Sequence, residues 1–217
     1  MHPFVYRGLN YNALHPPTWN PALEITAILL AAGAGSRFGG DKLLHPLPDG
    51  VAIGAHAARN LVAAGLDVVA VVKQGDFPLA DVLEQEGCSV TMFADYARGM
   101  GASLAHGVAQ RRSADGWIIA LADMPRIKSS TIAMIAKELA TGRELVAPAY
   151  KGQRGHPVGL GKRFGAQLAA LGGDAGARDI VAANQSELLL IECDDPGVLH
   201  DIDRREGLAP PAADDRA

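Results

Sequence analysis

The sequence has little of what marks several common classes of protein. Only 5% of its 217 residues are aromatic, its net charge is −4, and it has no long basic run. Since nucleic-acid surfaces usually combine a basic stripe with stacking aromatic side chains, these numbers argue against a nucleic-acid partner. The two cysteines, Cys88 and Cys193, are far apart and lack the spacing of metal ligands. This favours reduced, buried or half-buried thiols, as in cytoplasmic proteins.

Long hydrophobic runs are also missing. Residues 1–21 lack the basic start and apolar run of a signal peptide. The longest apolar stretch, residues 25–34, is about half as long as a membrane-spanning helix requires. We therefore expect a cytoplasmic protein with no membrane partner.

What the sequence does contain is an alternation of buried strands and helices. Continuously apolar or β-branched segments indicate strands at residues 24–32, 67–72, 89–93, 116–122, 145–149 and 188–192. Apolar residues at helical spacing indicate helices at residues 51–64, 77–86, 101–111, 130–139, 162–171 and 177–183. This order predicts one α/β domain with three layers (α/β/α) and a mostly parallel, Rossmann-like sheet.

The composition of the two ends differs from that of the middle. We expect an irregular N-terminal extension at residues 1–23, a domain at residues 24–207 and a flexible tail at residues 208–217, which is rich in Ala, Pro and Asp. Ligands of a parallel sheet bind beyond the carboxyl ends of its strands. The loops after Ala32, Val72, Phe93 and Ala122 are therefore expected at the ligand edge.

A glycine-rich segment follows the first predicted strand. Four glycines within residues 33–40 let the backbone curl and direct its N–H groups at an anion, and Arg37 and Lys42 add two cations. Together these features suit a triphosphate. A P-loop is excluded because Gly40 is followed by Asp41 rather than by Lys-Ser/Thr, and the dinucleotide fingerprint has no cations inside its loop.

The segment LAAGAGSRFGGDKLL at residues 30–44 resembles the signature of the MobA-like nucleotidyltransferases, and looks closest to their molybdenum cofactor cytidylyltransferase branch. The resemblance implies the fold of the nucleotide-diphospho-sugar transferases. It also implies that the loop wraps NTP phosphates, that Arg37 stabilises charge during transfer and that Lys42 binds phosphate. The residues expected to bind the nucleotide here are Leu30, Ala31, Ala32, Gly33, Ala34, Gly35 and Lys42. Leu-Ala-Ala-Gly looks like the CTP-using branch, whereas the guanylyl branch typically has Leu-Ala-Gly-Gly.

One carboxylate is expected to hold a metal at the ligand edge. Asp123 ends a predicted strand, and LADMP at residues 121–125 resembles the family's metal-binding L-x-D-x-P. We expect Asp123 to bind Mg²⁺ and to belong to the catalytic set. Because Mg²⁺ takes one or two protein carboxylates, a second is expected from Asp201 or Asp203, which resemble the family's late D-I-D. We favour Asp203.

The residues that follow this late motif differ from the family's usual sequence. Residues 204–207 read Arg-Arg-Glu-Gly, where the family usually continues with Thr-Pro-Glu-Asp. Asp194 and Asp195 are interpreted as surface turn residues.

Three further segments resemble motifs of the family. Gly99 and Ser103, in GMGASL at residues 99–104, would border the base and ribose, and Ser103 could also cap its helix. The segments GQRGHPV at residues 152–158 and GDAGAR at residues 173–178 resemble acceptor-side motifs. The residues assigned to the acceptor by this resemblance are Arg154, His156, Asp174 and Arg178. A structural role for His156 and an exposed helix start for Arg178 stay open as alternatives.

The resemblance implies Mg²⁺-dependent transfer of CMP from CTP to the phosphate of molybdopterin, with pyrophosphate as the second product. Since a phosphate nucleophile is already ionised, no general base is required, which fits a site of Lys, Arg and backbone N–H groups. A molybdenum hydroxylase that receives the product is the implied protein partner. The alternatives are guanylyl transfer, transfer to a sugar or alcohol phosphate, and a non-catalytic nucleotide-binding module. A dinucleotide-dependent dehydrogenase would not need Lys42 and Asp123 together.

Overall fold

The computed structural model describes residues 23–33 and 37–208, and the structural statements that follow concern those residues. The predicted extension at residues 1–23 and the tail at residues 208–217 lie almost entirely outside this part of the chain. Ala34 and Gly35 of the glycine-rich loop also lie outside the described residues. The domain boundaries and the roles of these two residues therefore stay predictions.

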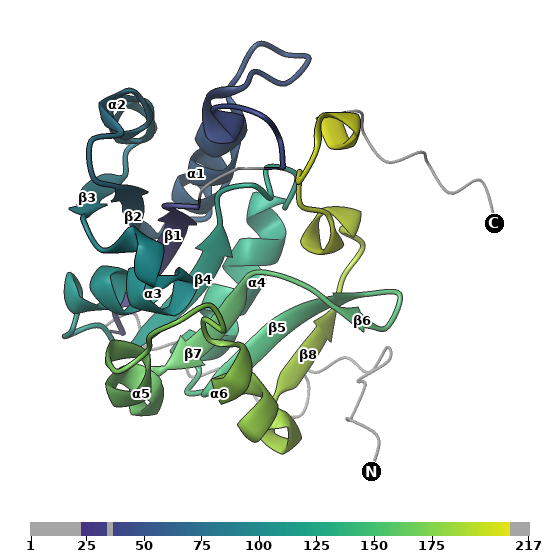
Figure 1. The fold of residues 1–217 in the computed structure, drawn as a ribbon. Helices are drawn as coiled ribbons and strands as arrows, with labels where there is room; N and C mark the ends of the chain where they lie inside the picture. Colours follow the sequence, from purple (N-terminus) through teal and green to yellow (C-terminus); the bar gives the residue numbers. More distant parts are fainter. Residues whose placement is uncertain (1–22, 34–36, 209–217) are drawn as a thin grey trace.

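An eight-stranded sheet forms the centre of the molecule (Figure 1). Its parallel half has the order β3 (Ser89–Phe93), β2 (Asp67–Lys73), β1 (Ile25–Ala31) and β4 (Gly116–Leu121). The other half continues with β7 (Val158–Gly161), β5 (Leu145–Tyr150) and β6 (Gln153–Arg154), and β8 (Leu189–Glu192) pairs with β5. Strands β1 to β5 and β8 share one direction, which confirms the predicted mostly parallel sheet.

Helices cover both faces of the sheet. The side chains of α1 (Ile53–Ala63), α2 (Phe77–Gln85) and α4 (Ser129–Ala140) pack in one buried cluster, and those of α3 (Met100–Ala109), α5 (Gly165–Ala169) and α6 (Arg178–Ala183) in another. The 3-10 helices are η2 (Lys42–Leu44), η3 (Tyr96–Arg98), η4 (Lys162–Phe164), η5 (Gln185–Glu187), η6 (Pro196–Leu199) and η7 (Arg205–Leu208). The predicted three layers are therefore present, and the helix predicted at residues 162–171 divides into η4 and α5.

Strand β1 shows why the apolar runs become central strands. Successive side chains of a strand point to opposite faces. Ala27 and Leu29 accordingly lie in the cluster with α1, and Ile28 lies in the cluster with α3. All three are fully buried. A side chain such as Leu29 contributes about 1.5–3 kcal/mol when it is buried, so a strand buried on both faces must be apolar throughout.

Strand β7 was not predicted. It is antiparallel to β4 and β5, and its sequence Val-Gly-Leu-Gly has little strand propensity. The structure explains the glycine at position 159, because a Cβ there would lie 2.9 Å from the side chains of Ile135 and Leu139 on α4. Close packing of α4 on the sheet therefore explains the sequence of β7 better than local strand propensity does.

Asp195 is not a surface turn residue, so that interpretation was wrong. Its side chain is buried and accepts hydrogen bonds from Lys128 N at 2.8 Å, Thr131 Oγ1 at 2.7 Å and Gly197 N at 3.1 Å. Two of these donors lie at the start of α4. Asp195, from a distant segment of the chain, therefore accepts hydrogen bonds that the first turn of this helix cannot make within itself. The neighbouring Asp194 is exposed, as expected.

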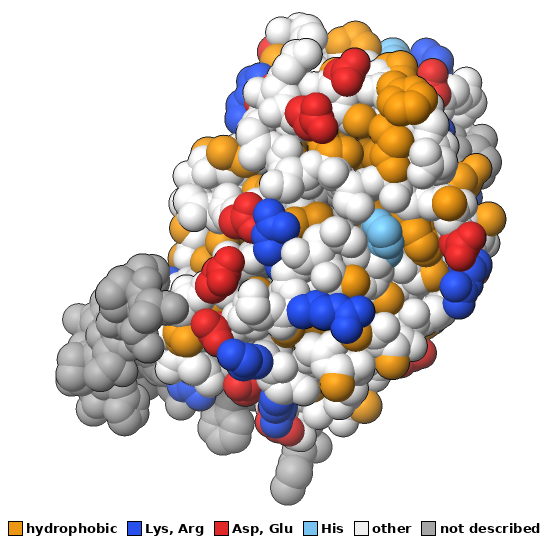
Figure 2. All heavy atoms as spheres, turned by 90° about the vertical axis from the view of Figure 1, so that its left-hand side faces the viewer, with side chains coloured by type: hydrophobic (Ala, Val, Ile, Leu, Met, Phe, Trp, Pro, Cys, Tyr) orange, Lys and Arg blue, Asp and Glu red, His pale blue; other side chains and the backbone are white. Residues whose placement is uncertain are grey.

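The surface carries charges of both signs. On the face shown in Figure 2, Lys and Arg side chains alternate with Asp and Glu, and the described residues form no continuous basic stripe there. In the same part of the chain, no helix combines the length and apolar character that crossing a bilayer requires.

Candidate active site

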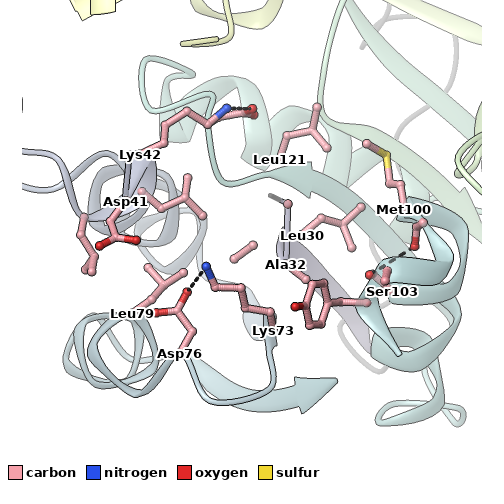
Figure 3. A pocket seen from close by; sticks show the side chains of 18 of the residues that line it. Leu30, Ala32, Asp41, Lys42, Lys73, Asp76, Leu79, Met100, Ser103 and Leu121 are labelled. Carbon is pink, nitrogen blue, oxygen red and sulfur yellow. Dashed lines mark hydrogen bonds and ion pairs between the residues drawn. The ribbon is translucent and has the colours of Figure 1, made fainter. Parts of the chain in front are cut away.

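The carboxyl ends of β1 to β4 meet at one edge of the sheet because these strands are parallel. A pocket of about 510 Å³ lies at this edge, within the size range of small-molecule sites (Figure 3). Its wall includes many of the residues predicted for the site: Leu30, Ala31, Ala32, Gly33, Lys42, Gly99, Ser103, Asp123 and Asp174. The strand-end rule therefore located the pocket correctly.

The fold brings Lys42, Asp123 and Asp203 together at the pocket. Lys42 Nζ donates to Asp123 Oδ2 at 2.7 Å and lies 4.0 Å from Asp203 Oδ1. The Lys42 side chain is only 11% exposed and that of Asp123 24%, so this ion pair is partly shielded from solvent. One ammonium group thus faces two carboxylates that come from distant parts of the sequence.

Arg37 forms the exposed side of the same cluster. Its Nη1 donates to Asp203 Oδ2 at 2.7 Å, and the two side chains are 72% and 43% exposed. The hydrogen bond and the charge of Asp203 raise the pKa of Arg37, and Arg37 in turn lowers the pKa of the Asp203 carboxyl. Because solvent screens exposed charges, this pair adds little stability, and a charged ligand can compete for either partner.

A small hydrophobic cluster holds the C-terminal segment against the glycine-rich loop. Phe38, Ile53 and Ile202 are buried together, and the Arg205 guanidinium lies 5.3 Å above the centre of the Phe38 ring. Ile202 N also donates to the Asp123 backbone oxygen at 2.9 Å. Because these contacts fix Ile202, the next residue, Asp203, lies close to Lys42. Asp201, on the other side of Ile202, is exposed. The geometry thus favours Asp203 over Asp201 as the second carboxylate.

The carboxylates fit a magnesium ion. No group of three or more His, Cys, Asp or Glu side chains is arranged to hold a metal within residues 23–33 and 37–208. Asp123 and Asp203 offer only oxygen ligands, which suit a hard cation. Mg²⁺ usually takes one or two carboxylates and completes its octahedron with phosphate oxygens and water. The residues present therefore fit a metal that binds together with a nucleotide.

The start of α3 forms another wall of the pocket. Gly99 has φ +102°, and a Cβ there would lie 2.3 Å from Asp174 Oδ1, so only glycine allows this close approach. Ser103 is buried, and its hydroxyl donates to the Gly99 oxygen at 3.4 Å rather than capping the helix. Asp174, assigned to the acceptor by resemblance, thus lies beside Gly99 in the wall of the pocket, next to a residue expected to border the nucleotide.

The other residues assigned to the acceptor lie outside the described wall of this pocket. Arg154 is exposed on β6, and Arg178 is exposed at the start of α6. Burial lowers the pKa of His156, the charge of Arg154 lowers it further, and the charges of Asp123 and Asp201 act in the opposite direction. Its Nδ1 atom is buried and has no hydrogen-bond partner in the part of the chain the structure describes. Of this set, His156 therefore lies within electrostatic reach of the carboxylates.

Comparison with known proteins places the chain in a family. Residues 27–188 match the MobA-like NTP transferase domain. This chain belongs to the MobA-like NTP transferase family. It is 29% identical over 191 residues to nicotine blue oxidoreductase from Paenarthrobacter nicotinovorans, a match that covers 84% of this chain and 93% of that protein. The predicted membership of the family is confirmed.

Solved structures show the same fold. Rv0371c from Mycobacterium tuberculosis H37Rv superposes with a TM-score of 0.75 at 25% identity, over 86% of this chain and 95% of that one. A nucleotidyl transferase from Methanothermobacter superposes with a TM-score of 0.71 at 21% identity, over 85% and 94% of the two chains. The predicted fold of the nucleotide-diphospho-sugar transferase type is confirmed.

One wall of the pocket contains residues that no sequence motif predicted. Lys73 and Asp76 line it where β2 passes into α2, and Tyr96 and Met100 line it beside α3. The position of Lys73 was a usable signal, since it directly follows Val72, whose loop was expected at the ligand edge. No motif marks Lys73, however, and a lysine at a strand end is common on protein surfaces.

Gly33 provides a test of the phosphate-binding role of the loop. It lines the pocket, and a Cβ at this position would meet no atom within 4 Å. We expect Gly33→Ala to fold with an unchanged melting temperature but to bind NTP about tenfold or more weakly, because the methyl group occupies space the nucleotide needs. Calorimetric titration with CTP and a thermal melt measure both effects.

Gly172→Ala is the matched control, because Gly172 is also free of close neighbours and lies outside the pocket wall among the described residues. Equal affinity of the Gly33 variant and this control for CTP would show that the nucleotide does not approach Gly33.

Proposed function

We propose that this MobA-like protein transfers CMP from CTP to the phosphate of molybdopterin that carries molybdenum, and forms the cytosine dinucleotide cofactor and pyrophosphate. The observation that carries the proposal is the cluster of Lys42, Asp123 and Asp203, in which Lys42 and Asp123 line the pocket and Asp203 lies 4.0 Å from Lys42. A cation for phosphate and two carboxylates for a hard metal ion are the groups that nucleotidyl transfer requires. Family membership supports the transferase class.

The residues can assist an in-line substitution at phosphorus. An oxygen of the acceptor phosphate attacks the α-phosphorus of CTP, and the bond to the β-phosphate oxygen breaks. Lys42 and Arg37 offset the negative charge that builds on the phosphate oxygens. Asp123 and Asp203 would hold Mg²⁺, which neutralises charge on the triphosphate. The reaction depends on positioning, so the proposal assigns no general base.

His156 supports an acceptor site within electrostatic reach of Asp123 and Asp201. Its buried Nδ1 has no partner within the described residues, and a buried polar atom normally has one. We infer that His156 and Arg154 contact the acceptor, since a phosphate or pterin ring would supply hydrogen-bond partners for both. Arg178, exposed on α6, is a weaker candidate for this contact.

The test is release of pyrophosphate in the presence of Mg²⁺ and molybdenum-loaded molybdopterin, with CTP, GTP, ATP and UTP supplied in turn. We expect release with CTP and formation of the cytosine dinucleotide. Release with GTP would contradict the choice of nucleotide that Ala31 and Ala32 suggest. No release with any nucleotide, despite binding of CTP, would point to another acceptor or to a binding module.

A parallel assay addresses the redox activity named for the Paenarthrobacter relative. It follows oxidation of NADH and NADPH by the same preparation, with nicotine blue as the electron acceptor. Oxidation without any pyrophosphate release in the first assay would replace the transferase proposal with an oxidoreductase.

A further inference from the structure

One charged pair in the pocket has no part in the transfer step. Lys73 ends β2 and Asp76 precedes α2, and Lys73 Nζ lies 3.3 Å from Asp76 Oδ2. Both side chains line the pocket, and they are 33% and 15% exposed. Figure 3 shows the pair on the opposite side of the pocket from Lys42. An ammonium group has three N–H donors, so the ion pair with Asp76 leaves donors for a ligand.

A tight turn holds the pair in place. Asp76 N donates to the Lys73 oxygen at 3.2 Å, and Gly75 supplies the positive φ of +87°. Asp76 stands at the N-cap position of α2, yet its carboxylate makes no capping hydrogen bond. Aspartate is among the preferred N-cap residues, and a cap stabilises a helix by about 1 kcal/mol. The carboxylate is directed to Lys73 instead, which is what a binding role for the pair predicts.

The strand order separates Lys73 and Asp76 from Lys42 and Asp123. Asp123 follows the end of β4, and Lys42 donates a hydrogen bond to it, whereas Lys73 ends β2, on the other side of β1. The register pairs Ala31 with Val72, so Lys73 follows beside Ala32. With neighbouring strands ~4.8 Å apart, the ends of β2 and β4 are separated by about 10 Å. A nucleoside triphosphate with its phosphates at Lys42 can span this distance with its base.

We propose that Lys73 and Asp76 contact the base of the NTP and select cytosine over uracil. This inference rests on the proposed function, since it assumes that the pocket binds a nucleotide. Cytosine presents an acceptor, N3, beside an amino donor at C4, so the ammonium donates to N3 and the carboxylate accepts from the amino group. Uracil presents a donor at N3 and an acceptor at C4, so both contacts fail. A site whose donor and acceptor match cytosine binds uracil more weakly, because the polar groups of the site are then left without hydrogen-bond partners.

Two variants separate a contact with the base from a structural role. Lys73→Met keeps the length of the side chain and removes its donors. Asp76→Asn removes the charge and keeps a residue type that is favoured before a helix. The measurement is the Kd of each Mg²⁺-loaded protein for CTP, UTP and inorganic tripolyphosphate by calorimetry. We expect the preference of the wild type for CTP over UTP to fall about tenfold or more in both variants. The affinity for tripolyphosphate should not change.

Lys137→Met is the matched control, because Lys137 is exposed on α4 and lies outside the described pocket wall. An unchanged ratio of CTP to UTP affinity in the Lys73 and Asp76 variants would overturn the inference. So would an equal loss of tripolyphosphate affinity, which would make Lys73 a phosphate ligand, or a wild type without preference between the two nucleotides.

This experiment measures only nucleotide binding, so its result does not depend on whether the protein transfers CMP. A wild type that prefers CTP but transfers no CMP would contradict the proposed function and leave this inference standing. A wild type that binds no nucleotide would contradict both.

Discussion

Replacing Asp123 by Asn lowers kcat for nucleotidyl transfer by about 10²–10³-fold, the loss that follows when one preorganised charge-stabilising group is removed from an active site. The substitution removes the negative charge that faces Lys42 at 2.7 Å and weakens the proposed metal site. Asn has nearly the shape of Asp, and the backbone contact from Ile202 N to the Asp123 oxygen does not depend on the side chain. The fold should therefore be retained. Pyrophosphate release at saturating CTP measures the effect.

Asp194→Asn is the control for this variant, since Asp194 is an exposed carboxylate outside the cluster. A titration with Mg²⁺ adds a second readout, because the loss of a metal ligand should raise the Mg²⁺ concentration needed for half-maximal activity. If Asp123→Asn keeps kcat within about threefold of wild type, the assignment of Asp123 as metal ligand is wrong.

Replacing Asp195 by Ala lowers the free energy of unfolding by about 3 kcal/mol or more, because three hydrogen bonds to a buried carboxylate disappear and their donors lose their partner. Those donors are Lys128 N, Thr131 Oγ1 and Gly197 N. Two of them lie at the start of α4, which packs on the sheet, so the loss reaches the core. Urea unfolding, with the slope of the transition compared between variants, measures this change.

Asp194→Ala is the matched control for stability. It removes a carboxylate from the adjacent position, but an exposed one, so its effect should stay within about 0.5 kcal/mol. Equal midpoints for the two variants would mean that Asp195 does not support α4 in solution. Asp194 and Asp195 are neighbours in the sequence, yet one is exposed and the other buried, and nothing in the sequence around them predicts this difference.

The parallel half of the fold was predictable because its information is local. A strand buried on both faces must be apolar throughout, as in β1 and β4, and an amphipathic helix must repeat its apolar residues at helical spacing. Strand β7 was missed because its Val-Gly-Leu-Gly segment is selected by contact with Ile135 and Leu139 on another element. Local propensity contains no such information.

The site was partly predictable for a similar reason. Glycines and cations after a strand predict an anion-binding loop, and the parallel order predicts which loops meet. Motif resemblance added Asp203, and the structure brings it to Lys42, although its role in metal binding stays a prediction. Neither approach identified Lys73 and Asp76, because a single lysine and a single aspartate match no pattern until a pocket surrounds them.

The sequence by itself determined the family, the three-layer class and the edge of the sheet where the pocket lies, because these follow from periodicity and from a continuous motif. Only the tertiary structure decided which carboxylate meets Lys42, that Asp195 is buried under α4, and that Lys73 faces the pocket. The physical reason is that burial and ion pairing depend on contacts between residues far apart in the chain. Such contacts form when Phe38, Ile53 and Ile202 pack together and bring the two ends of the domain to one site.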